Sequence, residues 1–330
     1  MKARFPIRLR GTGSYVPERV VDNQHFANYL DTNNDWIVTR TGIRERRWAA
    51  PEERTSTMAA KAARAAIENA GLTIQDIDLI VVATATGDCP FPSTAAFVQG
   101  ALGAGNIPAF DVSAACAGFL YAVEVASALI ASGAYRNVLV IGAETLSRYG
   151  DPEDRATAIL FGDGAGAAIL GPAEHAEQGI VHCENGCDGT KAELIWLPAG
   201  GSRLFASANT VAERLHYMHM RGREVYKFAV LKMLELIDRA LAACDLSADD
   251  LKLLIPHQSN LRIIESVREK LGLPESKVAV NIDRFGNTSA ASVVMNLDES
   301  CRNGTLQPGD HVLFIAIGAG LVWSTMVWRL

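Results

Sequence analysis

The chain has 330 residues, of which 49% are hydrophobic and 21% charged, and it carries a formal net charge of −6. This composition is typical of a globular protein with a large buried core, and a net acidic chain is not expected to bind nucleic acid through bulk charge. We find neither an apolar run as long as a membrane span nor a signal-peptide pattern in "MKARFPIRLRGTG", so we expect a cytoplasmic protein that does not bind a membrane.

Short apolar runs alternate with helical patterns along the first half of the chain. Strands are predicted by β-branched content and a helix by apolar spacing that ends at a glycine. The predicted strands cover 77–86, 106–112, 137–144 and 165–171, and the predicted helix covers 121–133. Strand–helix–strand alternation of this kind predicts a layered α/β fold.

The second half repeats this plan, with stretch 172–226 as its least regular part. Helices are predicted over 228–244, 260–272 and 287–304, and strands over 251–257, 277–283, 311–320 and 322–330. Strand 77–86 corresponds to 251–257, strand 137–144 corresponds to 311–318, and "IPAFDVSAACAG" corresponds to "VAVNIDRFGNTSAAS". We therefore predict an internal duplication, with one half over residues 1–172 and the other over 173–330.

The six cysteines are scattered through a chain too long to need disulfide staples, so we expect reduced thiols. Cys183 and Cys187 lie close to His182, but a zinc site needs four ligands and no second ligand pair follows. We expect no metal there.

Three polar residues stand where predicted strands end. Cys116 follows an apolar run and lies among small residues, where helix N–H groups and the helix dipole would stabilise a thiolate. His257 ends a strand, and Asn287 begins a predicted helix. Each alone has an ordinary explanation: a buried apolar cysteine, an exposed loop histidine and a helix N-cap. Together, at the carboxyl ends of strands, they predict a nucleophilic acyl-transfer site.

At these residues the chain resembles the 3-oxoacyl-[acyl-carrier-protein] synthase III family of the thiolase-like superfamily. The resemblance rests on "NNDWIVTRTGIRER", "DVSAACAGF", "LFGDGAGAAIL", "PHQSNLRI", "GNTSAAS" and "GAGLVWS", which lie in the family's order over nearly the whole chain. It implies a duplicated five-layer αβαβα fold and a homodimer.

The resemblance also implies a mechanism. Cys116 would take an acyl group from acyl-CoA, with the N–H groups of Cys116 and Ala319 as the oxyanion hole. His257 and Asn287 would then stabilise the enolate of malonyl-acyl carrier protein as carbon dioxide leaves, and the carbanion would attack the acyl-cysteine. The product would be the 3-oxoacyl-acyl carrier protein that initiates fatty acid synthesis, made without a metal or redox cofactor.

Binding residues are implied in the same way. Trp36 and Arg155 would sandwich the CoA adenine, and Phe91 would reach in from a second subunit to close the acyl pocket. The path for CoA would be lined by Thr32, Arg40, Arg223 and Asn260, the acyl pocket by Leu146, Phe161, Leu194 and Met218, and the docking surface for the acidic carrier protein would include Arg262, Arg40, Arg44, Arg46 and Arg47.

Two positions depart from the family pattern. Arg223 stands where the family often has asparagine, and Ala319 stands where it usually has glycine. A left-handed φ at Ala319 would cost energy, and both departures leave the acyl donor open.

The sequence leaves three other functions open. A cysteine hydrolase also uses Cys, His and Asn in this order, although the chain lacks the tryptophan expected just after its nucleophile. A dinucleotide-binding oxidoreductase would rest on "GDGAG" at 162–166 alone, and this turn leads into an apolar run rather than a crossover helix. A related condensing enzyme of secondary metabolism with another acyl donor fits the same residues.

Overall fold

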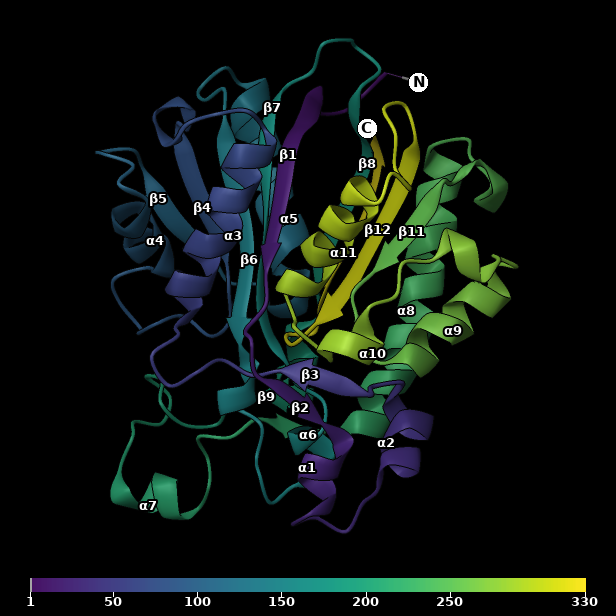
Figure 1. The fold of residues 1–330 in the computed structure, drawn as a ribbon. Helices are drawn as coiled ribbons and strands as arrows, with labels where there is room; N and C mark the ends of the chain where they lie inside the picture. The colour runs from purple at the N-terminus through teal and green to yellow at the C-terminus, as the bar shows by residue number, and fades with distance from the viewer. Residues whose placement is uncertain (1) are drawn as a thin grey trace.

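A computed structural model of the chain describes residues 2–330 and shows two sheets side by side, with helices between them and outside them (Figure 1). The first sheet has the strand order β1-β7-β6-β4-β5. Strands β4, β5 and β6 are parallel, whereas β7 runs antiparallel to both β6 and β1. Its strands are β1 Ile7–Tyr15, β4 Leu79–Ala83, β5 Ala109–Val112, β6 Val138–Thr145 and β7 Asp163–Pro172.

The second sheet repeats this topology with the order β11-β12-β13-β8. Strands β11 and β12 are parallel, and β13 is antiparallel to both β12 and β8, as β7 is to β6 and β1. Its strands are β8 Gly179–Cys187, β11 Leu253–Pro256, β12 His311–Gly318 and β13 Val322–Arg329. The predicted equivalence of β4 with β11 and of β6 with β12 therefore holds, and the division of the chain after residue 172 stays a prediction.

Helices form three layers around the two sheets, which gives the five-layer αβαβα order (Figure 1). Helix α3 packs on the outer face of the first sheet, α5 and α11 lie between the sheets, and α8 covers the outer face of the second sheet. The helices are α1 Asn23–Ala27, α2 Asn34–Thr41, α3 Thr55–Asn69, α4 Thr94–Leu102, α5 Gly118–Ala131, α6 Arg155–Ala158, α7 Ala208–Ala212, α8 Gly222–Ala243, α9 Leu261–Lys270, α10 Ile282–Phe285 and α11 Ala291–Arg302. Two small ribbons complete the fold, β2 Val20–Asp22 with β3 Glu45–Arg47 and β9 Ile195–Trp196 with β10 His219–Met220.

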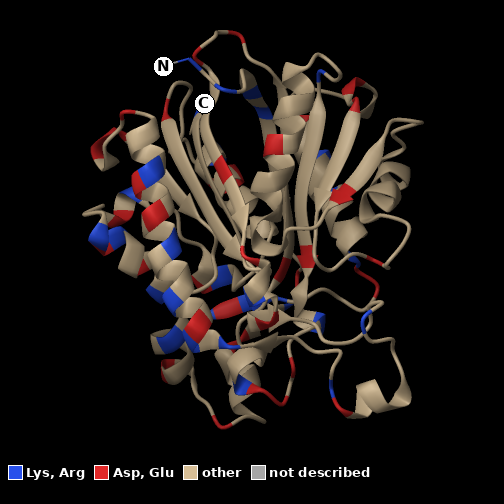
Figure 2. Cartoon of the chain, turned by 180° about the vertical axis from the view of Figure 1, so that it is seen from behind, with Lys and Arg blue, Asp and Glu red and all other residues tan. Residues whose placement is uncertain are grey.

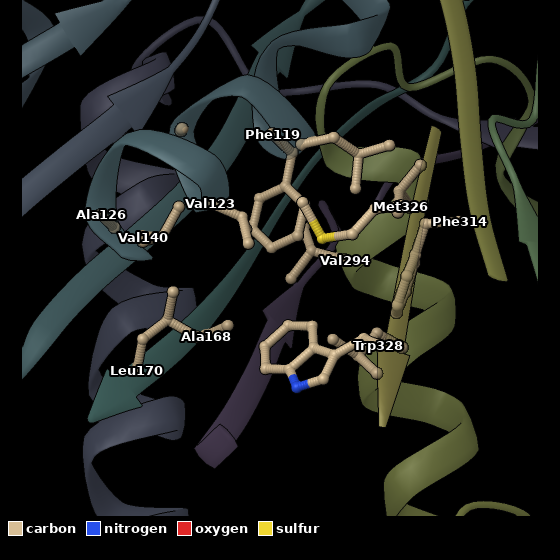
Figure 3. Packing of buried hydrophobic residues seen from close by; sticks show 14 of the residues in the cluster. Phe119, Val123, Ala126, Val140, Ala168, Leu170, Val294, Phe314, Met326 and Trp328 are labelled. Atoms are coloured by element: carbon tan, nitrogen blue, oxygen red, sulfur yellow. The ribbon is translucent and has the colours of Figure 1, made fainter. Parts of the chain in front are cut away.

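The central helices bury apolar side chains against both sheets (Figure 3). Phe119 of α5 and Val294 of α11 belong to one buried cluster with Phe314, Met326 and Trp328 of the second sheet. Because close-packed interiors resist rearrangement, this cluster holds the starts of α5 and α11 in fixed positions between the sheets. The sheets and central helices carry few charges, whereas Lys and Arg gather with acidic residues on the outer helices at the left of Figure 2.

The strand predicted over 277–283 is wrong. Only one parallel bridge forms there, between Val278 and Leu254, and α10 follows. The side chain of Gln258 takes the place of further strand pairing. Its amide donates to the carbonyl oxygen of Ala279 at 3.1 Å, and its oxygen accepts from the backbone N–H groups of Asn281 and Ile282 at 3.0 and 3.2 Å.

Other element boundaries also differ from the predictions. The helix predicted from Asn287 begins at Ala291, and the stretch 172–226 contains the regular strand β8. Strands β1 and β8 were not indicated by the sequence because both are edge strands that mix polar and apolar residues. Within residues 2–330, no helix combines the length and apolar character needed to cross a membrane.

Candidate active site

Cys116 lies in a tight 3₁₀ turn, Ala115–Ala117, that leads directly into α5. Ala115 adopts a left-handed φ of 44°, which is uncommon for a residue with a side chain and costs backbone energy. Gly318, at the end of β12, lies against this turn so closely that a Cβ atom there would be 2.7 Å from the Cys116 nitrogen. A strand end of the second sheet therefore meets the turn that carries the cysteine.

One cavity of about 410 Å³ joins the three predicted reactive residues. Cys116, His257 and Asn287 all line it, together with Ala319. Its other lining residues from the predicted sets are Trp36, Arg40, Leu146, Phe161, Met218, Arg223 and Asn260.

His257 is held in the cavity wall as a neutral imidazole. It is only 1% exposed, and burial lowers its pKa to about 3. No charged group acts on the ring to oppose this shift. Its Nδ1 lies 2.8 Å from the Ser292 hydroxyl, which also accepts a hydrogen bond from the Gln258 N–H. When the hydroxyl hydrogen is donated to Nδ1, the ring proton resides on Nε2, the nitrogen left for the cavity.

Asn287 is fixed by its backbone and by its own side chain. Its backbone pairs with Phe161 in a parallel bridge, and its Oδ1 accepts a hydrogen bond from the Ser289 N–H at 2.9 Å. Because the amide oxygen is occupied in this way, the Nδ2 donors are the part of the side chain left for the cavity.

The Cys116 thiol is not the ready thiolate that its place before a helix suggests. The cavity keeps the sulfur away from bulk water, and this burial raises its pKa to about 12. The carboxylate of Glu144 adds to the rise, whereas the side chain of Ser289 opposes it. The effect of desolvation on the thiol therefore exceeds the stabilising effect that the helix N-terminus would have on a thiolate.

Ala319 does not carry the backbone cost considered from the sequence. It is not among the residues with positive φ, whereas Gly320, next to it, has a φ of 143°. The glycine at 320 adopts the conformation that would have strained an alanine.

Trp36 and Arg155 meet at the edge of the cavity, but they stack on each other. The guanidinium carbon lies 4.4 Å from the indole centroid, and Arg155 also binds the Asp31 backbone oxygen. A flat base between two flat groups needs about 7 Å, twice the usual contact distance, so this pair would have to open to admit an adenine.

Several predicted residues lie elsewhere. Thr32 and Leu194 are half-buried and do not line the cavity, and the neighbouring Ile195 does so instead of Leu194. Phe91 is 85% exposed on the surface. The prediction that Arg46 receives a carrier protein is wrong, because Arg46 is 0% exposed. Its guanidinium binds Asn23 and the carbonyl oxygens of Val21 and Ile159.

Four residues around the reactive groups were not predicted from the sequence. Ser289 and Ile195 line the cavity, Ser292 holds His257, and Glu144 lies buried near Cys116. Both serines belong to "GNTSAAS", the motif that also contains Asn287. Glu144 is a carboxylate near the end of an apolar strand, so a search of strand ends for polar residues would have found it.

Comparisons with known proteins show which family this chain is similar to. Family models described as 3-oxoacyl-[acyl-carrier-protein] synthase III and as its C-terminal part match residues 110–189 and 241–330. The beta-ketoacyl-[acyl-carrier-protein] synthase III of Clostridioides difficile (strain 630) is 51% identical over 98% of both chains, and that of Symbiobacterium thermophilum is 49% identical over 100% of this chain and 99% of its own.

Solved structures agree with the sequence relatives. The 3-oxoacyl-[acyl-carrier-protein] synthase III of Aquifex aeolicus VF5 has a TM-score of 0.90 and 42% identity, with 98% of this chain and 100% of the other covered. The priming beta-ketosynthase of the R1128 polyketide pathway has a TM-score of 0.90 and 37% identity, with 100% and 98% covered.

A cysteine, a neutral histidine and an asparagine that converge from two like halves define an acyltransferase of the condensing, thiolase-like kind. Within that class, the chain belongs to the 3-oxoacyl-[acyl-carrier-protein] synthase III family.

Proposed function

We propose that this protein condenses an acyl-CoA with malonyl-acyl carrier protein, releases carbon dioxide and forms the 3-oxoacyl-acyl carrier protein that initiates fatty acid synthesis. The observation that carries the proposal is that Cys116, an uncharged His257 and Asn287 line one cavity. Full-length relatives bearing the synthase III name support it.

In the first half-reaction, the Cys116 sulfur attacks the acyl thioester, and the acyl group passes to the cysteine as CoA leaves. The N–H groups of Cys116 and Ala319 stabilise the oxyanion of the tetrahedral intermediate, since both residues border the cavity.

In the second half-reaction, His257 Nε2–H and Asn287 Nδ2–H donate hydrogen bonds to the thioester oxygen of the malonyl group. These neutral donors stabilise the enolate that forms as carbon dioxide leaves, and they do not protonate its carbon. The carbon then attacks the acyl-cysteine and displaces the Cys116 thiolate, which takes up a proton from solvent to regenerate the thiol. This chemistry calls for no metal or redox cofactor because decarboxylation itself supplies the carbanion.

The cavity mouth is the proposed CoA path. Trp36 and Arg155 would separate to hold the adenine, and Arg40, Arg223 and Asn260 would follow the pantetheine arm. Leu146, Phe161 and Met218 would bound the acyl group. The exposed Phe91 supports a homodimer in which each subunit closes the acyl pocket of the other.

Mass spectrometry of the intact protein after incubation with a panel of acyl-CoAs tests the first half-reaction. We expect one added acyl mass per chain and none on Cys116→Ala; retained labelling in that variant would contradict the assignment of Cys116 as the nucleophile.

Asn287→Asp is expected to lose condensation about 100-fold more than acylation, because a carboxylate repels the enolate. Equal loss of both steps would count against its role.

The same experiment separates the other candidates. A thioester hydrolase would release free acid and would not consume malonyl-acyl carrier protein. A condensing enzyme of another pathway, such as the structurally similar priming ketosynthase, would accept a different acyl donor, and the added mass identifies that donor.

A further inference from the structure

Arg223 borders both the reactive cavity and a second, outer hollow. It is the second residue of α8, and its side chain is exposed. The outer hollow has a volume of about 390 Å³ and is lined by Gly222, Arg223, Tyr226 and Arg262. The first three of these residues also line the cavity that contains Cys116. Arg223 therefore stands at the junction between the outer hollow and the cavity.

Four other arginines lie at or near the cavity mouth, and each of them has a partner. The guanidinium carbons of Arg40 and Arg155 lie 5.6 and 4.4 Å from the centroid of the Trp36 ring. The other two are Arg221, which lies 3.8 Å from Glu224, and Arg262, which lies 5.7 Å from the centroid of the Tyr226 ring. Within residues 2–330, the Arg223 guanidinium makes no ion pair, hydrogen bond or ring contact.

The position of Arg223 does not favour the stability of the fold. A cation in the first turn of a helix faces the partial positive charge of the helix N-terminus, which is unfavourable. Arg262 adds a second positive charge to the same hollow, and no carboxylate of residues 2–330 lies within 4.0 Å of either guanidinium. Two cations without a counter-charge are the arrangement that an anionic ligand would neutralise.

The chemistry of the proposed substrates indicates which anion this is. The pantetheine arm, which the proposed function leads past Arg223, is neutral along its length and ends in a phosphate. The planar guanidinium matches phosphate oxygens with two parallel hydrogen bonds. A carboxylate at the far end of an acyl group would instead lie beyond Cys116, in the acyl pocket, whose proposed walls are uncharged. The phosphate therefore fits Arg223 better than an acyl carboxylate does.

We propose that Arg223 binds the phosphate at the outer end of the pantetheine arm, a group that acyl-CoA and the arm of a carrier protein have in common. Asparagine, which the resembled family often has at this position, can donate hydrogen bonds but carries no charge. The inference rests on the proposed function for the identity of the two thioester substrates, but not for the binding of the phosphate itself.

Isothermal titration calorimetry of the full-length protein with 4′-phosphopantetheine and with pantetheine tests the proposal, because the two probes differ only in the phosphate. The wild type is expected to bind 4′-phosphopantetheine about tenfold more tightly. Arg223→Asn should reduce this preference to within about twofold. Arg223→Lys should keep a preference of about threefold, since lysine retains the charge but not the planar fork.

Arg221→Asn is the matched control. It removes the same charge two residues earlier, from a side chain that lies near Glu224, and it should keep the tenfold preference. A wild type that does not prefer 4′-phosphopantetheine, or that binds neither probe, would overturn the proposal. So would an Arg223→Asn variant that keeps the preference, or an Arg221→Asn variant that loses it to the same extent.

Steady-state kinetics then separate the two sources of the phosphate. In Arg223→Asn, the KM values for acyl-CoA and for malonyl-acyl carrier protein should both rise about fivefold, with kcat within about twofold. A rise for one substrate alone would contradict a shared phosphate site. A wild type that accepts no acyl-CoA would refute the proposed function, whereas the calorimetric comparison would still decide whether Arg223 binds the phosphate.

Discussion

At the scale of single residues, burial sets the charges of the site more strongly than hydrogen bonding does. It lowers the pKa of His257 to about 3 and raises that of Glu144 to about 7, so both groups favour their neutral forms. The stability that His257 contributes is present above pH 6.5 and is lost as the pH falls toward 3. That of Glu144 has the opposite sign: it is present below pH 4.5 and is lost as the pH rises through about 7.

The variant Glu144→Gln separates these two effects. A pKa raised from 4.5 to about 7 corresponds to about 3 kcal/mol. The free energy of unfolding of the variant should therefore gain about 3 kcal/mol on that of the wild type between pH 4 and pH 8. Urea unfolding at each pH measures the difference, and the His257 contribution cancels. A difference that does not change with pH would mean that Glu144 has an ordinary pKa.

The residue types identified the reactive groups in the sequence, but the sequence did not show which side chains are buried. Cys116, His257 and Asn287 were found because each follows a strand end. Arg46 was grouped with its basic neighbours although its side chain is 0% exposed, because a run of charges does not reveal which member turns inward. Glu144 was missed although it stands near the end of an apolar strand, where its polar side chain is visible in the sequence.

At the scale of elements, one side chain decides where the second sheet ends. Gln258 donates to the carbonyl oxygens of Pro256 and Ala279, and its oxygen accepts from two backbone N–H groups near the start of α10. The β-branched residues over 277–283 predicted a strand because they indicate a buried segment. They could not show that the side chain of Gln258, from another segment, binds the backbone groups that strand pairing would use. The prediction that a helix begins at Asn287 is wrong for a similar reason. The Asn287 side chain accepts a hydrogen bond from the N–H of Ser289, as in a turn, and helix α11 begins only at Ala291.

Gln258→Ala is therefore expected to destabilise the protein by about 3 kcal/mol, because it leaves several buried backbone groups unpaired. Gln307→Ala is the matched control, since Gln307 is exposed and its side chain binds only the Gly304 carbonyl oxygen. It should cost less than about 0.5 kcal/mol. Urea unfolding compares the two variants, and equal losses would show that Gln258 does not close the sheet.

At the scale of the whole molecule, the duplicated topology was predictable from the sequence, whereas strands β1 and β8 were not. The apolar strands β4, β6, β11 and β12 are buried and have clear sequence patterns. Strands β1 and β8 lie at sheet edges and carry mixed polar and apolar patterns, whereas β11, which also lies at an edge, is buried throughout. The duplication brings the carboxyl ends of β6, β11 and β12 from two sheets toward one cavity.

The charge distribution predicts how an acidic carrier protein would approach this cavity. The chain is net negative, yet Arg262, at the start of α9, is exposed and borders a second hollow with Arg223 and Tyr226 at the cavity mouth. An exposed charge at the rim of an interface acts mainly on association, and its effect weakens as salt shortens the Debye length. Arg262→Glu should therefore raise the KM for malonyl-acyl carrier protein about fivefold at low salt and leave kcat within about twofold.

Arg136→Glu is the control with the same change of charge. Arg136 is exposed and precedes β6, so it lies at the end of the first sheet opposite the cavity. It should leave the KM unchanged, and raising the ionic strength to about 0.5 M should bring the Arg262→Glu variant and the wild type together. Equal effects of the two substitutions would show that the carrier protein responds to net charge. A difference that persists at high salt would assign Arg262 a contact that does not depend on its charge.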